Sequence, residues 1–139
     1  MPIDCLNPMV RLGSSGEVHA MVAGGVAHLV DLRAEATPAS SSTPVDHIPI
    51  EDLARDQDEP ILQAARRVKE LADSGVVVGV YCQAGVSRTA AVAIAYLMLE
   101  GMSLDEATAR LRECRPHALP ALGLWRSLEA IETRLRPEG

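Results

Sequence analysis

The sequence predicts an α/β fold in which helices flank a central, mostly parallel sheet. Short apolar runs at 26–32 and 76–81 are typical of buried strands, and longer segments with apolar residues at helical spacing follow the strands. This alternation along one chain favours helices packed on the faces of a parallel sheet. The chain has 139 residues, the length of one domain, which we expect to span 1–139.

Each expected element carries its own local signals. Gly24 and Gly25 precede the first strand, and Pro49 marks an extended segment as a sheet edge or strand end. Asp58 is placed to cap a helix, with Pro60 in its first turn. The elements expected in chain order are a short helix at 17–23, a strand at 26–32, a polar loop at 37–44, an extended segment at 45–50, a helix from Asp58 to Gly75, a strand at 76–81, an almost wholly apolar helix at 89–99, a helix opened by a capping box at 103–106 with Leu104, Ala107 and Leu111 inward, and a terminal helix lined by Leu124, Trp125, Leu128, Ile131 and Leu135.

Composition and charge narrow the class of function. A net charge of −6 argues against nucleic acid or an anionic membrane surface as the main partner, and the chain has no apolar stretch of membrane-spanning length. Residues 1–10 lack a cationic region, so we expect no secretion signal and a cytoplasmic location. Cys5, Cys82 and Cys114 are too widely spaced for a disulfide framework or a zinc site, and the histidines show no ligand pairing. We therefore expect neither a metal nor a cofactor.

The segment from Cys82 to Thr89 carries the chemistry. Cys82 follows a buried strand, Arg88 begins a buried helix, and five small or uncharged residues with Gly85 in the middle lie between them. Such a loop turns backbone N–H groups inward as an anion-binding nest at a helix N-terminus, and Arg88 adds a fork for two anion oxygens. These groups also favour the thiolate form of Cys82, placed to attack a bound phosphate. The non-functional alternative is that Cys82 is only a small buried residue before a tight turn. The combination of a strand, a cysteine, an arginine and a buried helix favours a catalytic role instead.

The same segment resembles the C-x5-R-[ST] signature of cysteine-dependent protein phosphatases, most closely those of the dual-specificity type. Residues 48–52, Ile-Pro-Ile-Glu-Asp, are similar to that family's general-acid region. Residues 93–99 with 102–107 resemble its helices after the signature, and Arg115-Pro116 resembles the turn that follows. The resemblance implies hydrolysis of phosphotyrosine, and also of phosphoserine or phosphothreonine, in phosphorylated proteins or small phosphoesters.

Carried over residue by residue, the resemblance implies a division of labour in the loop. Cys82 would be the nucleophile that forms a phosphocysteine, Arg88 would clamp the phosphoryl group, and Thr89 would hydrogen-bond the sulfur and help it leave. The phosphate-binding cradle would be formed by Gln83, Ala84, Gly85, Val86, Ser87 and Arg88.

The implied general acid is Asp52, which would protonate the leaving oxygen and then act as base on water. Asp56 and Asp58 are nearby competitors, and Asp52 is favoured. Two residues depart from the family pattern. Tyr81 stands where a histidine usually supports the loop, and Ala121 stands where the family often has asparagine.

Three alternatives stay open on the sequence alone. Tyr81-Cys82 and residues 28–33 also resemble rhodanese-type sulfurtransferases, in which the cysteine carries a persulfide, although their loops are usually one residue shorter. Tyr81 also suits a module that binds phosphorylated partners without turning them over. A phosphoinositide substrate is disfavoured because the variable loop positions are uncharged. The sequence leaves open the physiological substrate, the oligomeric state and any redox role of Cys5 or Cys114.

Overall fold

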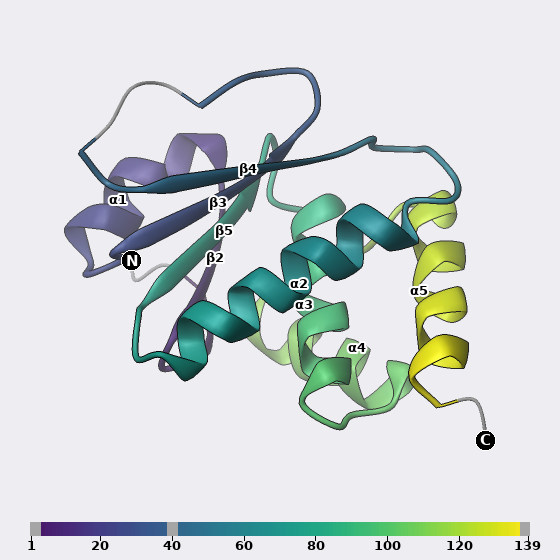
Figure 1. The fold of residues 1–139 in the computed structure, drawn as a ribbon. Helices are drawn as coiled ribbons and strands as arrows, with labels where there is room; N and C mark the ends of the chain where they lie inside the picture. Colours follow the sequence, from purple (N-terminus) through teal and green to yellow (C-terminus); the bar gives the residue numbers. More distant parts are fainter. Residues whose placement is uncertain (1–3, 39–41, 137–139) are drawn as a thin grey trace.

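The computed structural model describes residues 4–38 and 42–136 and places five strands in one sheet, in the order β1-β2-β5-β3-β4 (Figure 1). The strands are β1 (Asp4–Asn7), β2 (Val10–Ser14), β3 (His28–Arg33), β4 (Val45–Ile50) and β5 (Val78–Cys82). Only the β1–β2 pair is antiparallel, and the other three pairs are parallel. The prediction of a mostly parallel sheet is therefore confirmed, with β5 at its centre.

Helices cover both faces of this sheet, as expected for an α/β fold. The helices are η1 (Ser15–Glu17), α1 (Val18–Ala23), α2 (Asp58–Asp73), α3 (Arg88–Leu99), α4 (Leu104–Cys114) and α5 (Leu122–Leu135). The short α1 lies on one side of the sheet, and α2 to α5 gather on the other (Figure 1). Within the described ranges, no helix is long and apolar enough to cross a bilayer.

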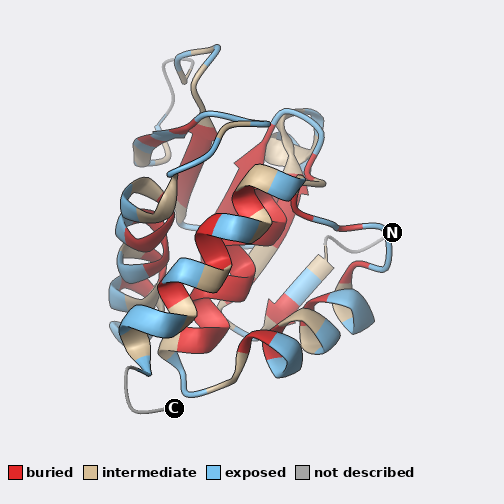
Figure 2. Cartoon of the chain, turned by 90° about the vertical axis from the view of Figure 1, so that its right-hand side faces the viewer, coloured by how far each residue is buried: buried red, intermediate tan, exposed pale blue. Residues whose placement is uncertain are grey.

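Alternation along β5 divides the core into two parts. Val78, Val80 and Cys82 join the large cluster beneath α2 to α5, while Tyr81 belongs to a smaller cluster with Met21 of α1. Successive side chains of a strand point to opposite faces, so Tyr81 and Cys82 must face different helical layers. Figure 2 shows buried residues concentrated in the strands and on the inward helix faces. Tyr81 therefore lies on the opposite face of the sheet from Cys82.

The helix α3 is the most buried helix, and every residue from Arg88 to Met98 is buried. A helix without a polar face needs cover on most sides. It contacts α2, α4 and α5 as well as strands β2 and β5. Because this helix starts at Arg88, the end of the predicted functional loop is anchored in the core.

The start of α2 differs from the expectation in one detail. Asp58 is the first helical residue rather than the cap, and Gln57 precedes it without a side-chain capping bond. The Asp58 carboxylate instead accepts a hydrogen bond from Arg134 of α5 at 3.1 Å. Pro60 does occupy the first turn. In α4, the predicted capping box is confirmed, since Ser103 and Glu106 bind each other's backbone N–H groups.

Several strand boundaries differ from the sequence prediction, and two strands were not predicted. The strands expected at 26–32 and 76–81 correspond to β3 and β5, each of which starts two residues later and ends one residue later than expected. The segment at 45–50 is an edge strand, as Pro49 indicated. β1 and β2 are short and pair with each other, and only β2 joins them to the sheet through the distant β5, so local patterning gave little sign of them. Of the loop expected at 37–44, residues 39–41 lie outside the described residues, and the rest form no helix or strand.

Candidate active site

Cys82 lies at the carboxyl end of the central strand β5, where it is 2% exposed. In parallel α/β sheets, ligands bind at the carboxyl ends of the strands. The Thr89 hydroxyl donates to the Cys82 Sγ across 3.0 Å from the first turn of α3. The sulfur therefore has one fixed donor and faces the positive end of a buried helix, an arrangement that stabilises negative charge on it.

The loop between Cys82 and α3 is held from outside through its carbonyl oxygens. Three carbonyls accept hydrogen bonds from neighbouring elements: Gln83 from the Ser15 N–H at 3.3 Å, Gly85 from the Arg115 Nε at 2.8 Å, and Val86 from the Leu119 N–H at 3.0 Å. In a planar trans peptide, the C=O and the following N–H point in opposite directions. The N–H groups of Ala84, Val86 and Ser87 must then point into the loop, as an anion-binding nest requires.

Gly85 occupies a position that admits no side chain. Its φ is +70°, and an added Cβ would lie 2.6 Å from the Arg115 Nη2 and 2.8 Å from the Gly13 carbonyl oxygen. Arg115 is 5% exposed, and its guanidinium also binds Asp4 at 2.6 Å and Glu17 at 3.2 Å. The sequence indicated a family-like turn at Arg115-Pro116 but not this role. Arg115 ties the loop to the end of α4 and to the N-terminal strand.

Arg88 enters the site from the first residue of α3. Its Nη1 and Nη2 donate to the two carboxylate oxygens of Glu35 at 2.6 and 2.8 Å. These bonds raise the pKa of Arg88 against the opposing effect of burial, and the charges of Cys82, Glu35 and Asp52 add to the increase. The same bonds are the main reason why the pKa of Glu35 falls to about 2. No sequence pattern pointed to Glu35, which lies two residues after the end of β3.

Tyr81, in the place of the usual histidine, belongs to a charged network on the other face of the sheet. Its hydroxyl donates to the Asp31 Oδ2 at 3.0 Å, and Arg33 grips the same carboxylate with Nε and Nη2 at 3.0 and 2.9 Å. The Arg33 guanidinium also lies 5.4 Å above the Tyr81 ring and reaches the Gln83 side chain at 3.5 Å. Burial, assisted by the Asp31 charge, raises the pKa of Tyr81 to about 12. The Tyr81 phenol next to the loop is therefore uncharged, and the Asp31–Arg33 ion pair holds it in place.

The two candidate acids occupy different parts of the 51–57 loop. Asp52 is exposed, and its Oδ1 accepts the N–H of Leu53 at 3.1 Å. Its charge acts on Arg88. Asp56 has a left-handed backbone with φ +57° and lines a hollow of about 340 Å³ with Arg126 and Ser127 of α5. Asp58 is engaged by Arg134. Of the three carboxylates, Asp52 is the one whose charge acts on the functional loop.

Ala121 stands where the family often has asparagine, and its backbone, not its side chain, contacts the loop. Its backbone N–H donates to the Ser87 Oγ at 2.8 Å. The connection between α4 and α5 is therefore joined to the loop by this bond and by the Leu119–Val86 bond. The absence of asparagine at this position does not leave the loop untethered.

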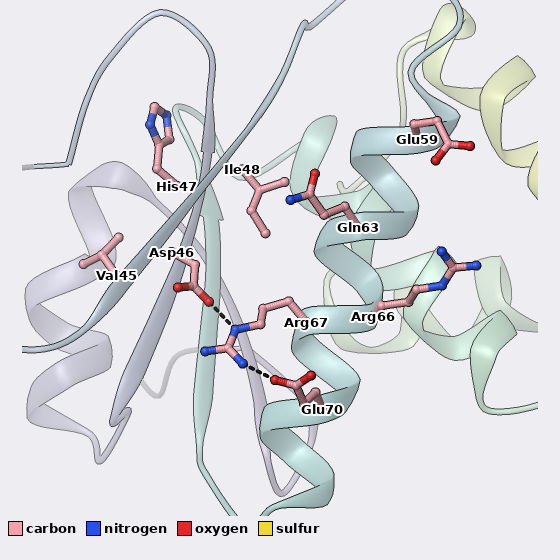
Figure 3. A pocket seen from close by; sticks show the side chains of 9 residues that line it. All are labelled: Val45, Asp46, His47, Ile48, Glu59, Gln63, Arg66, Arg67 and Glu70. Carbon is pink, nitrogen blue, oxygen red and sulfur yellow. Dashed lines mark hydrogen bonds and ion pairs between the residues drawn. The ribbon is translucent and has the colours of Figure 1, made fainter.

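A second hollow lies away from Cys82. The groove of about 750 Å³ between β4 and α2 is lined by charged side chains, among which Arg67 links Asp46 to Glu70 (Figure 3). None of its lining residues belongs to the loop that holds Cys82. Across residues 4–38 and 42–136, no group of three or more histidine, cysteine, aspartate or glutamate side chains is arranged to hold a metal ion. Among the described residues, no disulfide joins Cys5, Cys82 or Cys114.

A buried thiol, an arginine at a helix start and the loop between them are arranged as a cysteine-based anion-binding site requires. Residues 14–134 match the family model "Dual specificity phosphatase, catalytic domain". The chain therefore belongs to the dual specificity phosphatase family, and the prediction of a phosphatase of this type is confirmed. This assignment favours phosphatase chemistry over the sulfurtransferase alternative.

Individual relatives resemble the whole chain. Mouse dual specificity phosphatase 28 is 35% identical, with the match covering 99% of this chain and 88% of that protein. The crystal structure of human dual specificity phosphatase 28 aligns with a TM-score of 0.84 at 29% identity, over 98% of this chain and 96% of that one. A mouse putative dual specificity phosphatase, solved with zinc tungstate, gives a TM-score of 0.84 at 29% identity over 99% and 90%. These matches confirm the predicted α/β phosphatase fold.

Proposed function

We propose that this chain hydrolyses phosphotyrosine in proteins, and phosphoserine or phosphothreonine presented to the same loop, through a phosphocysteine on Cys82. In the first step the thiolate attacks phosphorus, so the S–P bond forms while the P–O bond to the substrate breaks. The departing oxygen takes a proton from Asp52. Arg88 and the inward amides of the loop bind the transferring oxygens, where charge builds up.

In the second step, water replaces the sulfur. Asp52 takes a proton from the water, the new P–O bond forms, and the S–P bond breaks with its electron pair returning to sulfur. The Thr89 hydroxyl, 3.0 Å from Sγ, stabilises the thiolate as it leaves. Inorganic phosphate then departs and the enzyme returns to its starting state. A nucleophilic thiolate needs a reducing compartment, which supports the expected cytoplasmic location.

The observation that carries this proposal is the Thr89–Cys82 contact at the start of the buried α3, because it fixes the thiol beside an anion-binding loop. The zinc tungstate bound by a mouse relative lends further support, since tungstate is a tetrahedral oxyanion of phosphate-like shape. The competing function is a module that binds phosphorylated partners without hydrolysis, for which Tyr81 is the motive. Tyr81 is uncharged and binds Asp31 on the face of the sheet opposite Cys82, so it does not disturb the surroundings of the cysteine. For this reason we favour catalysis.

The test compares wild type with Cys82→Ser on phosphotyrosine peptides. A serine hydroxyl is a poor nucleophile here because the loop holds no adjacent base, so hydrolysis is expected to vanish while peptide binding persists. Binding can be followed by fluorescence anisotropy and hydrolysis by released phosphate. Cys114→Ser, at a free thiol outside the loop, is the matched control. Wild-type protein that binds the peptides but releases no phosphate would refute catalysis and support the binding module.

Asp52 is tested by the leaving group. Asp52→Asn is expected to slow phenyl phosphate hydrolysis by roughly 10²–10⁴, because the departing phenolate needs a proton. An activated ester with an acidic leaving group is expected to slow much less. The pH profile is also expected to lose its alkaline limb, which reports deprotonation of the acid. Asp56→Asn is the control, and a leaving-group effect in that variant alone would move the acid role to Asp56.

A further inference from the structure

Most of the large apolar side chains that the described residues expose lie on segments beside the loop that holds Cys82. The four exposed side chains are Val22, Leu53, Leu119 and Leu122, with exposed fractions of 36%, 81%, 57% and 70%. Val22 belongs to α1, on the other side of the sheet (Figure 1). We call the three leucines the apolar rim. Single exposed leucines are ordinary, but apolar side chains gathered at one site indicate a contact surface.

The connection between α4 and α5 places two of these leucines next to the loop. The Leu119 N–H donates to the Val86 carbonyl oxygen at 3.0 Å. The N–H of Ala121, the residue before Leu122, donates to the Ser87 Oγ at 2.8 Å. These two hydrogen bonds hold the backbone of the connection against the loop, while the side chains of both leucines stay exposed to solvent beside it.

A backbone contact with the start of α5 brings Leu53 to the same place. Gly123 approaches Ala54 so closely that an added Cβ would lie 2.2 Å from the Ala54 carbonyl oxygen. Figure 1 shows the segment after β4 passing the start of α5. Leu53 and Leu122 are the chain neighbours of this touching pair. Because Leu53 also follows the candidate acid Asp52, the apolar rim begins at the residue that would protonate the leaving group.

The position of Leu53 favours neither its backbone nor its side chain. Its φ is +64°, in the left-handed region that glycine, asparagine and aspartate adopt more readily than leucine. With 81% of its surface exposed, the side chain gains little from burial in the folded chain. Strained backbone positions cluster at active and ligand-binding sites. Contact with a bound partner is therefore a physical reason for a leucine at this position.

From this arrangement we propose that the apolar rim binds apolar side chains that flank the phosphorylated residue of a protein substrate. The inference rests on the proposed function and adds substrate selectivity to it. A polypeptide whose phosphoryl group reaches Cys82 must place its neighbouring residues over the segments beside the loop, and these segments carry the rim. Apolar flanking residues would remove the exposed leucines from water, which favours binding.

The size of the apolar rim favours a peptide segment over a second copy of this chain. A stable interface between two proteins involves roughly 20–30 residues on each side. The rim has three leucines, and Leu53 is bordered by the exposed charged residues Glu51, Asp52 and Arg55. Charged residues are depleted at the centres of protein interfaces. A short apolar flank, by contrast, needs only the leucines themselves.

The experiment compares two phosphotyrosine peptides that differ only in the residues on either side of the phosphotyrosine, leucine in one and serine in the other. The measured quantity is the ratio of their kcat/KM values, in which effects common to both peptides cancel. Wild type is expected to prefer the leucine peptide by about tenfold, the size of effect that burial of an aliphatic side chain can give.

Leu53→Asn combined with Leu122→Gln is expected to bring this ratio close to one. Asparagine adopts a left-handed backbone more readily than leucine, so the loss of selectivity would not come from added backbone strain. Leu119→Gln, made separately, is expected to lower the ratio in part. Val22→Thr is the matched control, because it makes an exposed apolar side chain polar on the other side of the sheet, and it is expected to keep the wild-type ratio.

The possible results separate this inference from the proposed function. Equal kcat/KM values for the two peptides in wild type, or a preference that survives in the double variant, would overturn the inference and leave the proposed function standing. Wild type that forms dimers in sedimentation velocity, lost only in the double variant, would assign the apolar rim to a second copy of this chain and also overturn the inference. Wild type that hydrolyses neither peptide would overturn the proposed function, and this inference with it.

Discussion

Replacing Gly85 with alanine tests how closely the loop is held by its surroundings. The residue has φ +70°, which costs an alanine about 1–2 kcal/mol. The new Cβ would also meet the Arg115 Nη2 at 2.6 Å and the Gly13 carbonyl oxygen at 2.8 Å. Crowding of this kind typically costs about 1–3 kcal/mol. The free energy of unfolding is therefore expected to fall by about 2–5 kcal/mol.

Gly75 is the matched control for this substitution. Its φ is +84°, yet an added Cβ would meet nothing within 4 Å. Gly75→Ala thus has the left-handed backbone without the collision, and an expected loss of about 1–2 kcal/mol. Urea denaturation followed by circular dichroism gives both values under one protocol.

The difference between the two variants isolates the close approach of Arg115 and Gly13. Gly85→Ala is also expected to lose inhibition by inorganic phosphate, because relieving the collision displaces the inward amides, while Gly75→Ala keeps it. Equal losses of stability in the two variants, with phosphate inhibition intact in both, would show that Arg115 does not constrain the loop.

Two further substitutions test the sulfur contact and the tyrosine. Thr89→Val removes the hydroxyl 3.0 Å from the Cys82 Sγ, so breakdown of the phosphocysteine is expected to slow roughly ten- to a hundredfold, whereas Thr89→Ser retains it. Rapid-quench kinetics should then give a burst of product with a slow steady state, and a slow first turnover would contradict this role. The pKa of Tyr81 is raised to about 12 in the folded protein. The folded protein therefore keeps the phenol proton at pH values at which the unfolded chain has already released it. The free energy of unfolding is therefore expected to fall as the pH rises from about 10 to about 12, less steeply in Tyr81→Phe, and equal slopes would contradict the assignment.

The elements that the sequence predicted well are those with strong local signals. The amphipathic face of α2, the apolar α3 and the capping box of α4 each depend on residues close together in the chain, and all three are present. β1 and β2 are different. Val10 and Leu12 alternate with Arg11, but a run of this length becomes a strand only when a distant partner such as β5 is available.

The residues of the candidate site differ in the same way, since some are placed by local sequence spacing and others by long-range contacts. Cys82, Arg88 and Thr89 follow one another within a single loop and helix start, so the spacing in the sequence was enough to place them together. Glu35 and Arg115 reach the loop from more than 25 residues away, through side-chain contacts that no local pattern encodes. Asp52 lies between these cases, since its role was inferred from a resemblance and its placement depends on how the 51–57 loop folds.

The burial of α3 has a thermodynamic consequence. Arg88 and Thr89 occupy the first turn of the helix on which α2, α4 and α5 pack, so an anion held by that turn binds the folded chain and not the unfolded one. Mass action then turns occupancy into resistance to heat: an oxyanion at a hundred times its Kd adds about 2.7 kcal/mol to the free energy of unfolding. For a domain of this size, each kilocalorie raises the melting temperature by a few degrees. Thermal melting can therefore rank phosphate mimics and phosphopeptides in the Cys82→Ser protein, in which no turnover would consume them.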